Sequence, residues 1–420
     1  MESGVGPEWQ FGSDPSNLTR RPIMAHGVDT VDRNLLVGLA QDLIRIPSVS
    51  GNEREIVGFL HRRLVELGLE TKIQEVLPGR SNLIASLQKG KGGPTVLFNG
   101  HLDTLPGPDP EHKPYEPRIQ GDWLFGTGIT NMKGAVAAMV TAMVALRKME
   151  TPPGRVILTA VSGECDTIGL GTRYALESGI TADVAINGEP TNMRILTAHA
   201  GVTQLFIRTS GSGYHVYRKA EGCNAIEKMV NVLHGLNESI LTFEPGNSFH
   251  TGLPCVNVGI INGGNVASLM AKECVAKVDV RLVSGMTPES VLSDLQNYLA
   301  RLKSQDPTLQ VEVSMVEKPV FMHPRPFKIS EDAEIVQIVA EACRQVISQI
   351  PEIGHLYPEV YYGSDASHLL EFGIPTAICG PGNSSEISVV DEKISIEQLF
   401  QASQVYAISA LQVLSKFAKR

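Results

Sequence analysis

Hydrophobic and polar residues recur with two different periods along this chain, and the change of period divides it. From about residue 29 to residue 197, apolar runs typical of buried strands alternate with helical patterns. Helices are predicted near 30–46 and 52–68 and over 135–148, and strands over 82–87, 95–99, 156–161 and 184–187. Strands that alternate with helices predict a mostly parallel sheet with helices on both faces.

The pattern after about residue 197 favours half-exposed strands. Apolar and polar residues alternate over 202–208, 255–261, 274–283 and 309–316, with helical stretches at 224–236 and 287–302. These elements predict a two-helix, four-stranded α+β module. The α/β pattern returns with 332–350, 376–379 and 396–417. We therefore expect a flexible tail (1–28), a main domain in two parts (29–197 and 317–420) and an inserted domain (198–316).

Composition narrows the class of protein. The chain has 420 residues, of which 42% are hydrophobic and 19% charged, as in globular proteins. A net charge of −9 weighs against nucleic acid or an anionic membrane as partner. No apolar run reaches the length of a membrane span, and the N-terminus lacks the apolar core of a signal peptide. We expect a cytoplasmic protein.

Cysteines are scattered without a CxxC spacing, so neither a zinc knuckle nor a redox pair is predicted. Most are expected to be small buried hydrophobes, such as Cys379 in an apolar strand pattern. Cys165 differs, because it lies in a polar, glycine-flanked turn that follows a strand.

Other polar residues also follow predicted strands. His101 and Asp103 come directly after the strand at 95–99, where the carboxylate can orient the imidazole, although a structural histidine in a turn gives the same pattern. The glycine-rich loop 126–134 precedes a helix but lacks the full pattern of a nucleotide site. Glu189 follows the strand at 184–187, and a metal ligand and a turn cap explain it equally well.

The order of these segments resembles one family. The segments are His101-Leu-Asp103, the loop 126–134, the turn 165–172, Glu189-Pro-Thr191, and Gly380-Pro-Gly382 followed by Asp391-Glu392. Together they resemble the zinc-dependent aminoacylase, acetylornithine deacetylase, succinyl-diaminopimelate desuccinylase and glutamate carboxypeptidase family over roughly residues 30–420. The resemblance implies an α/β catalytic domain with a mixed, mostly parallel sheet flanked by helices. It also implies a ferredoxin-like, four-stranded lid that commonly dimerises, so a homodimer through the lid is expected.

Several departures from the family pattern fall on the metal site. The resemblance implies two metals, and His101 and Glu189 match two ligands of one of them. The bridging aspartate is replaced by Asn131, and the second metal's histidine by Ser388, a poor zinc ligand. We therefore expect a degenerate site with no obligatory cofactor. The alternative is one Zn or Mn held by His101, Glu189 and Asp166.

The family's general base aligns with Cys165, which changes the expected chemistry. With the metals gone, Cys165 is a candidate nucleophile, His101 its base and Asp103 the group that orients the base. Asn131 would donate a hydrogen bond to the imidazole or to an oxyanion. Shifting the alignment by one residue makes Glu164 the base and Cys165 a soft ligand, but the spacing to Gly169 disfavours this shift.

Substrate contacts are also implied by the resemblance. His215 matches a lid histidine that polarises the scissile carbonyl in the partner subunit's site, although a structural lid residue is possible. Arg281 resembles an arginine that binds a substrate carboxylate, its alternative being a surface ion pair. The remaining expected substrate-binding residues are Asn224, Glu189, Ser388 and Asp365.

Three functions follow. The favoured one is a metal-independent enzyme that acts through Cys165 on an amide or acyl bond of a small, carboxylate-bearing molecule, by acyl transfer, amide formation or hydrolysis. The second is a single-metal hydrolase of an N-acyl amino acid or small peptide. The third is a catalytically inactive binding homologue.

Overall fold

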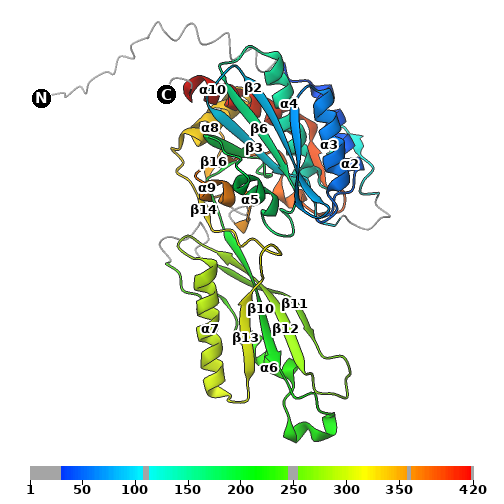
Figure 1. Cartoon of the computed structure of the whole chain (residues 1–420), viewed down its shortest axis with the longest axis vertical. Helices are drawn as coiled ribbons and strands as arrows, with labels where there is room; N and C mark the ends of the chain where they lie inside the picture. Colours follow the sequence, from blue (N-terminus) through cyan, green and yellow to red (C-terminus); the bar gives the residue numbers. More distant parts are fainter. Residues whose placement is uncertain (1–29, 107–112, 245–253, 357–360, 418–420) are drawn as a thin grey trace, which may run out of the picture.

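The computed structural model describes residues 30–106, 113–244, 254–356 and 361–417 (Figure 1). The expected tail at 1–28 lies outside the described residues. The helices are α2 Arg33–Arg45, α3 Arg54–Glu66, α4 Gly134–Lys148, α5 Leu170–Glu177, α6 Ala225–His234, α7 Pro288–Gln305, α8 Glu334–Ile347, α9 Ala366–Glu371 and α10 Ile396–Phe417.

Eight strands form the large sheet in the order β1-β2-β6-β3-β7-β16-β8-β15. Their bounds are β1 Glu70–Leu77, β2 Arg80–Lys89, β6 Gly154–Val161, β3 Thr95–His101, β7 Val184–Asn187, β16 Thr376–Ile378, β8 Ile195–Leu196 and β15 Ile353–Gly354. The central strands β6, β3, β7 and β16 run parallel, whereas β1–β2, β2–β6 and β16–β8 pair antiparallel. The mixed, mostly parallel sheet is as expected.

Alternate residues of the central strands face two cores. In β3, Val96 and Phe98 join the larger core, to which α2, α3, α4, α8 and α10 contribute. Leu97 faces the other way, into a smaller core with residues of α5 and α9. Because side chains alternate across a strand, a continuous apolar run needs helices on both faces of the sheet. The helices therefore hold the strand ends in fixed positions.

The lid has its own sheet, with the order β11-β12-β10-β13. Its strands are β10 Gly201–Ser210, β11 Cys255–Gly263, β12 Glu273–Leu282 and β13 Gln310–Met315. With α6 between β10 and β11 and α7 between β12 and β13, the chain order is βαββαβ, the ferredoxin-like arrangement that was expected. The helix α7 begins at a capping box between Thr287 and Ser290 with Pro288 in its first turn. The domain boundaries given above stay predictions.

Figure 1 shows the lid extending away from the large sheet, joined to it near β14. Strand β14 (Phe327–Lys328) pairs with β9 (Ala198–His199), so the outgoing and returning chain lie side by side at this junction. A third small sheet contains β17 Lys393–Ser395, β5 Trp123–Phe125 and β4 Arg118–Gln120. Among the described residues, the helical stretch Ile129–Lys148 is long and apolar enough to span a membrane, but 94% of its 18-residue apolar segment is buried inside the protein.

Candidate metal centre

Three neighbouring strands deliver the polar side chains of the site. Strand β3 lies between β6 and β7 and runs parallel to both, so all three carboxyl ends meet at one edge of the sheet. His101 ends β3, Glu164 lies three residues beyond the end of β6, and Glu189 lies two residues beyond the end of β7. All three side chains are buried. The fold therefore brings together residues that are far apart in sequence.

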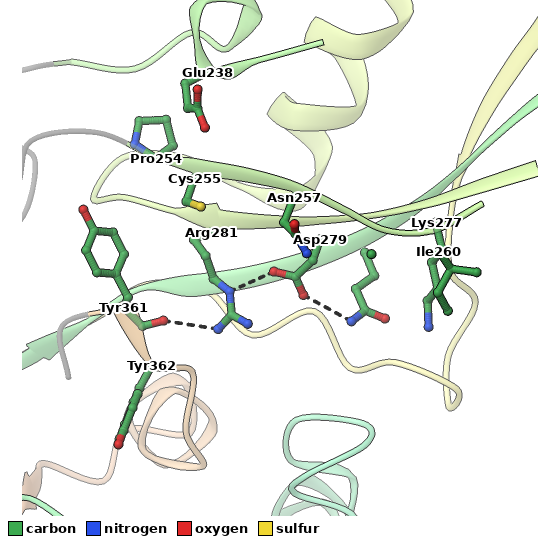
Figure 2. Close-up of a pocket in the computed structure, with 12 residues that line it drawn as sticks. Glu238, Pro254, Cys255, Asn257, Ile260, Lys277, Asp279, Arg281, Tyr361 and Tyr362 are labelled. Atoms are coloured by element: carbon green, nitrogen blue, oxygen red, sulfur yellow. Dashed lines mark hydrogen bonds and ion pairs between the residues drawn. The ribbon is translucent and has the colours of Figure 1, made fainter. Parts of the chain in front are cut away.

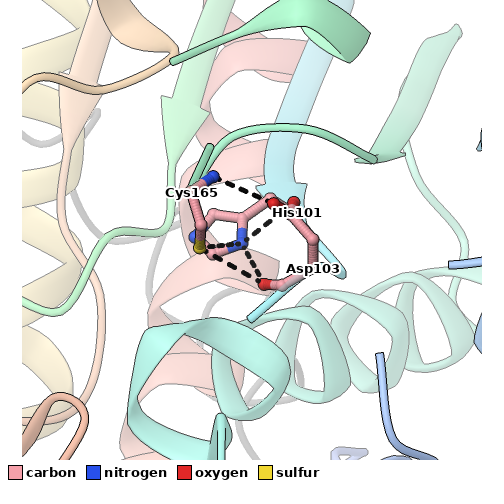
Figure 3. Close-up of side chains that lie close together, drawn as sticks. All are labelled: His101, Asp103 and Cys165. Atoms are coloured by element: carbon pink, nitrogen blue, oxygen red, sulfur yellow. Dashed lines mark hydrogen bonds and ion pairs between the residues drawn. The ribbon is translucent and has the colours of Figure 1, made fainter. Parts of the chain in front are cut away.

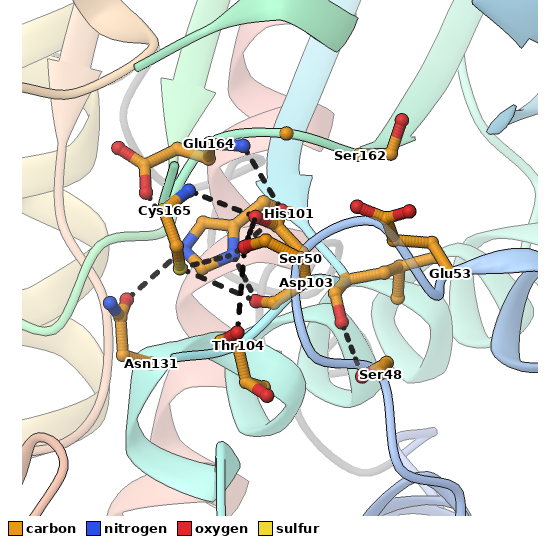
Figure 4. A network of polar contacts seen from close by, with 12 residues as sticks. Ser48, Ser50, Glu53, His101, Asp103, Thr104, Asn131, Ser162, Glu164 and Cys165 are labelled. Atoms are coloured by element: carbon orange, nitrogen blue, oxygen red, sulfur yellow. Dashed lines mark hydrogen bonds and ion pairs between the residues drawn. The ribbon is translucent and has the colours of Figure 1, made fainter. Parts of the chain in front are cut away.

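One nitrogen of His101 faces the acidic groups. Nε2 lies 3.6 Å from Glu164 Oε2, 3.7 Å from Glu189 Oε1 and 3.2 Å from Asn131 Oδ1. Figure 4 shows Asn131 and Glu164 on the side of the imidazole away from Asp103. Nδ1 lies 2.8 Å from the backbone carbonyl of Asp103 and donates to it in the neutral tautomer. That bond leaves the Nε2 lone pair directed at the carboxylates, as in a metal-binding histidine.

The carboxylate of Asp103 holds the turn that carries Glu164. It accepts hydrogen bonds from the backbone amides of Glu164 (3.1 Å) and Cys165 (2.9 Å) and from Ser50 Oγ (2.8 Å). Figure 4 shows these contacts beneath the turn. The role predicted for Asp103, orientation of the imidazole, is thus carried out by its backbone carbonyl, while its side chain positions the neighbouring turn.

The electrostatics of the site call for a cation. Burial by itself lowers the pKa of His101, but Glu164, Glu189, Asp103 and Asp365 together raise it to about 9. Burial raises the pKa of Glu189 to about 7 against the opposing effect of His101, and it raises the pKa of Glu164 well above its usual range. Several buried carboxyl groups around one imidazole are costly to ionise without a positive charge between them.

The donor set fits a divalent metal ion. Ligand atoms about 2.1 Å from a tetrahedral ion are about 3.4 Å apart, close to the three distances measured from Nε2. Glu189 Oε1 is buried and has no hydrogen-bond partner among the described residues, so a lone pair is left for a ligand. His101, Glu164 and Glu189 also lie within 4.8 Å of one another by their ligand atoms. The residues present therefore suit one ion such as Zn²⁺ or Mn²⁺.

Cys165 is placed differently from the prediction. Its Sγ lies 4.0 Å from His101 Nδ1 and 3.6 Å from the Asp103 carbonyl (Figure 3). The nitrogen nearest the thiol is the one bonded to Asp103, so it is not free to accept the thiol proton. Burial raises the pKa of Cys165 well above its usual range, and the carboxylates of Asp103 and Glu164 raise it further. An activated thiol has a lowered pKa, so burial and the surrounding carboxylates make Cys165 a poor nucleophile.

Asp166, which the resemblance aligns with a ligand of the second metal, lies outside the His101 cluster. Asp166 is 40% exposed and pairs with Arg80, at 2.8 Å and 3.1 Å to its two oxygens. Arg80 also binds the buried carboxylate of Glu53. Asp166 is therefore held by a guanidinium, and Glu164 takes the place beside His101 and Glu189 that the alternative prediction gave to Asp166. Ser388 and Asn131 line a small pocket together with Glu392.

Arg281 lines a cavity of about 890 Å³ between the lid and the loop that precedes α9 (Figure 2). Its guanidinium donates to Asp279 Oδ1 at 2.8 Å and to the Tyr361 carbonyl at 3.2 Å. Four residues after Tyr361, the same loop supplies Asp365, which is buried and raises the pKa of Glu189. Burial raises the pKa of Asp365 to about 6 despite the opposing effect of His101.

The two other lid residues lie outside the His101 cluster. Asn224 caps α6, because its Oδ1 accepts from the backbone amides of Ile226 (3.0 Å) and Ala271 (3.3 Å). His215 is exposed, its ring lies tilted against that of Tyr217 with centroids 5.0 Å apart, and its Nδ1 accepts a hydrogen bond from the Tyr217 amide at 3.4 Å.

Sequence reasoning missed or underrated three residues. Glu164 entered only through the shifted alignment. Arg80 was not singled out, because its ion pairs with Glu53 and Asp166 become visible only once the fold is known. Glu392 accepts from the amides of Gly128 (2.9 Å) and Thr130 (2.8 Å) and so fixes the loop that carries Asn131. Its place in the shared Asp391-Glu392 motif was the available signal.

Known proteins are similar to most of the chain. The model of peptidase family M20/M25/M40 matches residues 97–412. The acetylornithine deacetylase of Aliivibrio salmonicida (strain LFI1238) is 29% identical over 399 residues, which cover 90% of this chain and 96% of that protein. The N-formyl-4-amino-5-aminomethyl-2-methylpyrimidine deformylase of Bacillus subtilis (strain 168) is 27% identical over 415 residues, covering 88% and 92%. The M20 family metallo-carboxypeptidase Sso-CP2 of Sulfolobus solfataricus shares the fold with a TM-score of 0.72 at 16% identity, covering 90% and 99%.

These findings correct one expectation and establish the family. The prediction of no cofactor is wrong: the matching family includes a metallo-carboxypeptidase, and His101, Glu164 and Glu189 lie close enough together for a metal ion to bind among them. The favoured cysteine mechanism was predicted on the premise that no metal is bound, so it loses its support as well. The chain belongs to peptidase family M20/M25/M40 and is an enzyme of the amidohydrolase type that acts on amide C–N bonds.

Proposed function

We propose that the protein is a single-metal amidohydrolase that removes an acyl group from the nitrogen of a small, carboxylate-bearing compound. The observation that carries the proposal is the convergence of His101 Nε2, Glu189 Oε1 and Glu164 Oε2 at the ends of three adjacent strands. The names of two relatives, an N-acetyl and an N-formyl hydrolase, favour a small acyl group.

His101 and Glu189 would hold the ion, and the amide oxygen of Asn131 would be the third ligand atom. When bound, the ion would supply the positive charge that acidifies water and stabilises negative charge on the scissile carbonyl oxygen. Asn131 Oδ1 already lies 3.2 Å from His101 Nε2, on the same side of the ring as Glu189. A neutral amide in this position cannot bridge two cations as a carboxylate does, which accords with one ion.

Glu164 carries the proton. Its carboxylate accepts a proton from the attacking water and passes it to the amine nitrogen as the C–N bond breaks. Burial raises the pKa of Glu164, which suits a group that must both take and release a proton near neutral pH. The hydrogen bonds from the Glu164 and Cys165 amides to Asp103 keep this carboxylate in place.

Arg281 binds the substrate carboxylate at the lid. Two of its donors are engaged by Asp279 and Tyr361, which orients the planar fork toward the cavity of Figure 2. His215, from the lid of a second copy of the chain, completes the site by donating to the scissile carbonyl oxygen. Asn224 supports that lid region as the cap of α6. Small N-acyl amino acids have the size and charge for such a site.

Metal content and kinetics of matched variants test the proposal. The purified enzyme, loaded with Zn²⁺ or Mn²⁺ and desalted, should contain about one ion per chain and should hydrolyse members of a panel of N-acetyl and N-formyl amino acids. His101→Ala and Glu189→Gln should lose both metal and activity. Glu164→Gln should keep its metal while kcat falls by about 10²- to 10⁴-fold.

An exposed acid provides the control. Glu116, with a side chain that is 65% exposed, should tolerate Glu116→Gln without change in metal content or kcat. Loss of metal in Glu164→Gln would make Glu164 a ligand and refute its role as proton carrier. A wild-type enzyme that binds no metal after loading would refute the proposal as a whole.

A further inference from the structure

The turn that carries Glu164 is closed by its own backbone. It runs from Ser162 to Gly169, between β6 and α5. The amide of Ile168 donates to the Glu164 carbonyl at 2.8 Å, and the amides of Gly169 and Leu170 donate to the Gly163 carbonyl at 3.3 Å. Because the two ends of the turn are bonded to each other, a displacement of Ile168 is passed to Glu164.

Ile168 occupies an unfavourable backbone conformation. Its φ is 54°, in the left-handed region that β-branched residues rarely adopt. Such a residue persists only where its surroundings hold it. His368 of α9 lies with Nε2 2.9 Å from the Ile168 carbonyl and donates to it, so part of the restraint comes from the catalytic domain.

The rest of the restraint comes from the junction between the domains. The Ile168 side chain packs against a cluster of Val202, Val316 and Phe321, which are 0%, 3% and 1% exposed. In addition, the Met322 amide donates to the Thr167 carbonyl at 2.8 Å. A Cβ on Gly363 would lie 2.6 Å from Val202 Cγ2 and 3.3 Å from Ile168 Cγ2, so the chain also closes tightly over this contact.

These partners belong to the two chain segments that join the lid to the catalytic domain. Val202 is the second residue of β10, where the chain enters the lid, and its amide donates to the Pro324 carbonyl on the returning segment at 3.0 Å. His323 fastens the two segments further, with Nδ1 2.8 Å from Thr203 Oγ1 and Nε2 2.6 Å from the Val316 carbonyl. We call residues 201–204 and 315–326 the hinge.

We infer that Ile168 and Thr167 couple the hinge to the Glu164 turn, so that the position of the lid sets the position of the Glu164 carboxylate. Ile168 and Thr167 are positioning residues, and this inference rests on the proposed role of Glu164. The turn has two anchors, His368 in the catalytic domain and the Val202 cluster in the hinge. A lid that moves therefore pulls on one anchor while the other stays fixed.

A pair of identical substitutions separates this coupling from loss of stability. Val202 and Val278 are both fully buried valines of the lid sheet, but Val278 lies in the lid's own core. Val202→Ala should raise amide hydrogen exchange in a peptide covering residues 163–170 by at least about threefold, and Val278→Ala should leave that exchange unchanged. With the metal bound in each, Val202→Ala should lower kcat about tenfold with KM within about twofold, because the carboxylate is misplaced.

Substitution at Ile168 gives a second measure. Ile168→Ala should reproduce the loss in kcat, and Ile168→Val, which keeps the branched contact, should restore at least half of it. Equal exchange of the turn in Val202→Ala and wild type would overturn the coupling, and so would an equal increase in Val278→Ala. Because exchange needs no substrate, a wild-type enzyme inactive on N-acyl amino acids would refute the proposed function and leave the exchange result valid.

Discussion

Cys165 decides between two kinds of chemistry at the scale of one residue. Burial and the carboxylates of Asp103 and Glu164 raise the pKa of its thiol, so at neutral pH it is protonated and a weak nucleophile. We predict that Cys165→Ala keeps its metal and retains kcat/KM within about threefold of wild type, since no proposed step passes through sulfur. Steady-state kinetics on the substrate found for the wild type measure this directly.

Alkylation offers an independent check of the thiol. With iodoacetamide at pH 7, Cys165 should react more slowly than Cys255, whose side chain is exposed. A loss of activity above about 100-fold in Cys165→Ala, with metal content unchanged, would instead support Cys165 as the catalytic nucleophile.

The sequence predicted most of the residues at this site but not the direction of every side chain. His101, Asp103 and Glu189 follow the ends of predicted strands, and parallel strands bring such positions together, whereas Asn131 lies in the segment just before α4. Glu164 and Cys165 are consecutive, and which of them faces the imidazole depends on how the turn bends. That bend comes from Gly163 at φ 74° and Ile168 at φ 54°, and motif spacing does not reveal a left-handed isoleucine.

At the scale of the element, the β9–β14 pair predicts acid sensitivity. His199 of β9 is fully buried, stacks on Phe327 of β14 with centroids 5.1 Å apart, and lies 2.8 Å from both the Ala200 carbonyl and Ser364 Oγ. Burial lowers its pKa from 6.5 to about 4. Between pH 6.5 and pH 4 the unfolded chain binds a proton at His199 that the folded protein does not bind. The contribution of His199 to stability is therefore complete above pH 6.5 and falls as the pH drops toward 4.

The size of this effect follows from the pKa difference. One pKa unit corresponds to about 1.4 kcal/mol, so His199 should remove roughly 2 kcal/mol from the free energy of unfolding between pH 7 and pH 5. Urea unfolding of wild type and His199→Gln at both pH values measures it. The pKa values of His323 and His368 are also lowered by burial, so the decisive quantity is the difference between the two proteins. Equal pH dependence in both would contradict the prediction.

Strong local patterns predicted the elements, and weak ones did not. Strand 184–187 and helix 396–417 have the predicted bounds because continuous apolar and long amphipathic patterns are unambiguous. Strand β1 was missed, since as an edge strand it is largely exposed and shows no apolar run. The short helices α5 and α9 were also missed. Strand order and the antiparallel pairs at the sheet edges depend on contacts between distant residues, which no local period encodes.

At the scale of the whole molecule, the lid presents an apolar surface. Strand β11 is an edge of the lid sheet and is exposed along almost its whole length. Ile260 and Ile261 of this strand are 51% and 49% exposed, and Val230 of the neighbouring α6 is 57% exposed. An exposed edge strand with large apolar side chains is prone to pair with another chain. This surface supports the expected homodimer through the lid.

If His215 acts across that interface, two inactive variants should repair each other. A Glu164→Gln chain lacks the proton carrier, and a His215→Ala chain lacks the group given to its partner. A mixed dimer has one site with both lesions and one site with neither, because each site combines Glu164 of one chain with His215 of the other. Random mixing makes half of the dimers mixed, so activity should return to about a quarter of the wild-type value.

The interface itself provides the control for this repair. Adding Ile261→Glu to both chains places a carboxylate on the exposed edge of β11, outside the cavity that Arg281 lines, which should give 45.4 kDa monomers in analytical ultracentrifugation. These monomers should keep their metal, since His101 and Glu189 lie in the catalytic domain, but mixing them should restore no activity. Recovery with the intact interface and none without it would place His215 in the partner's site. Mixed dimers without recovery would confine each site to a single chain.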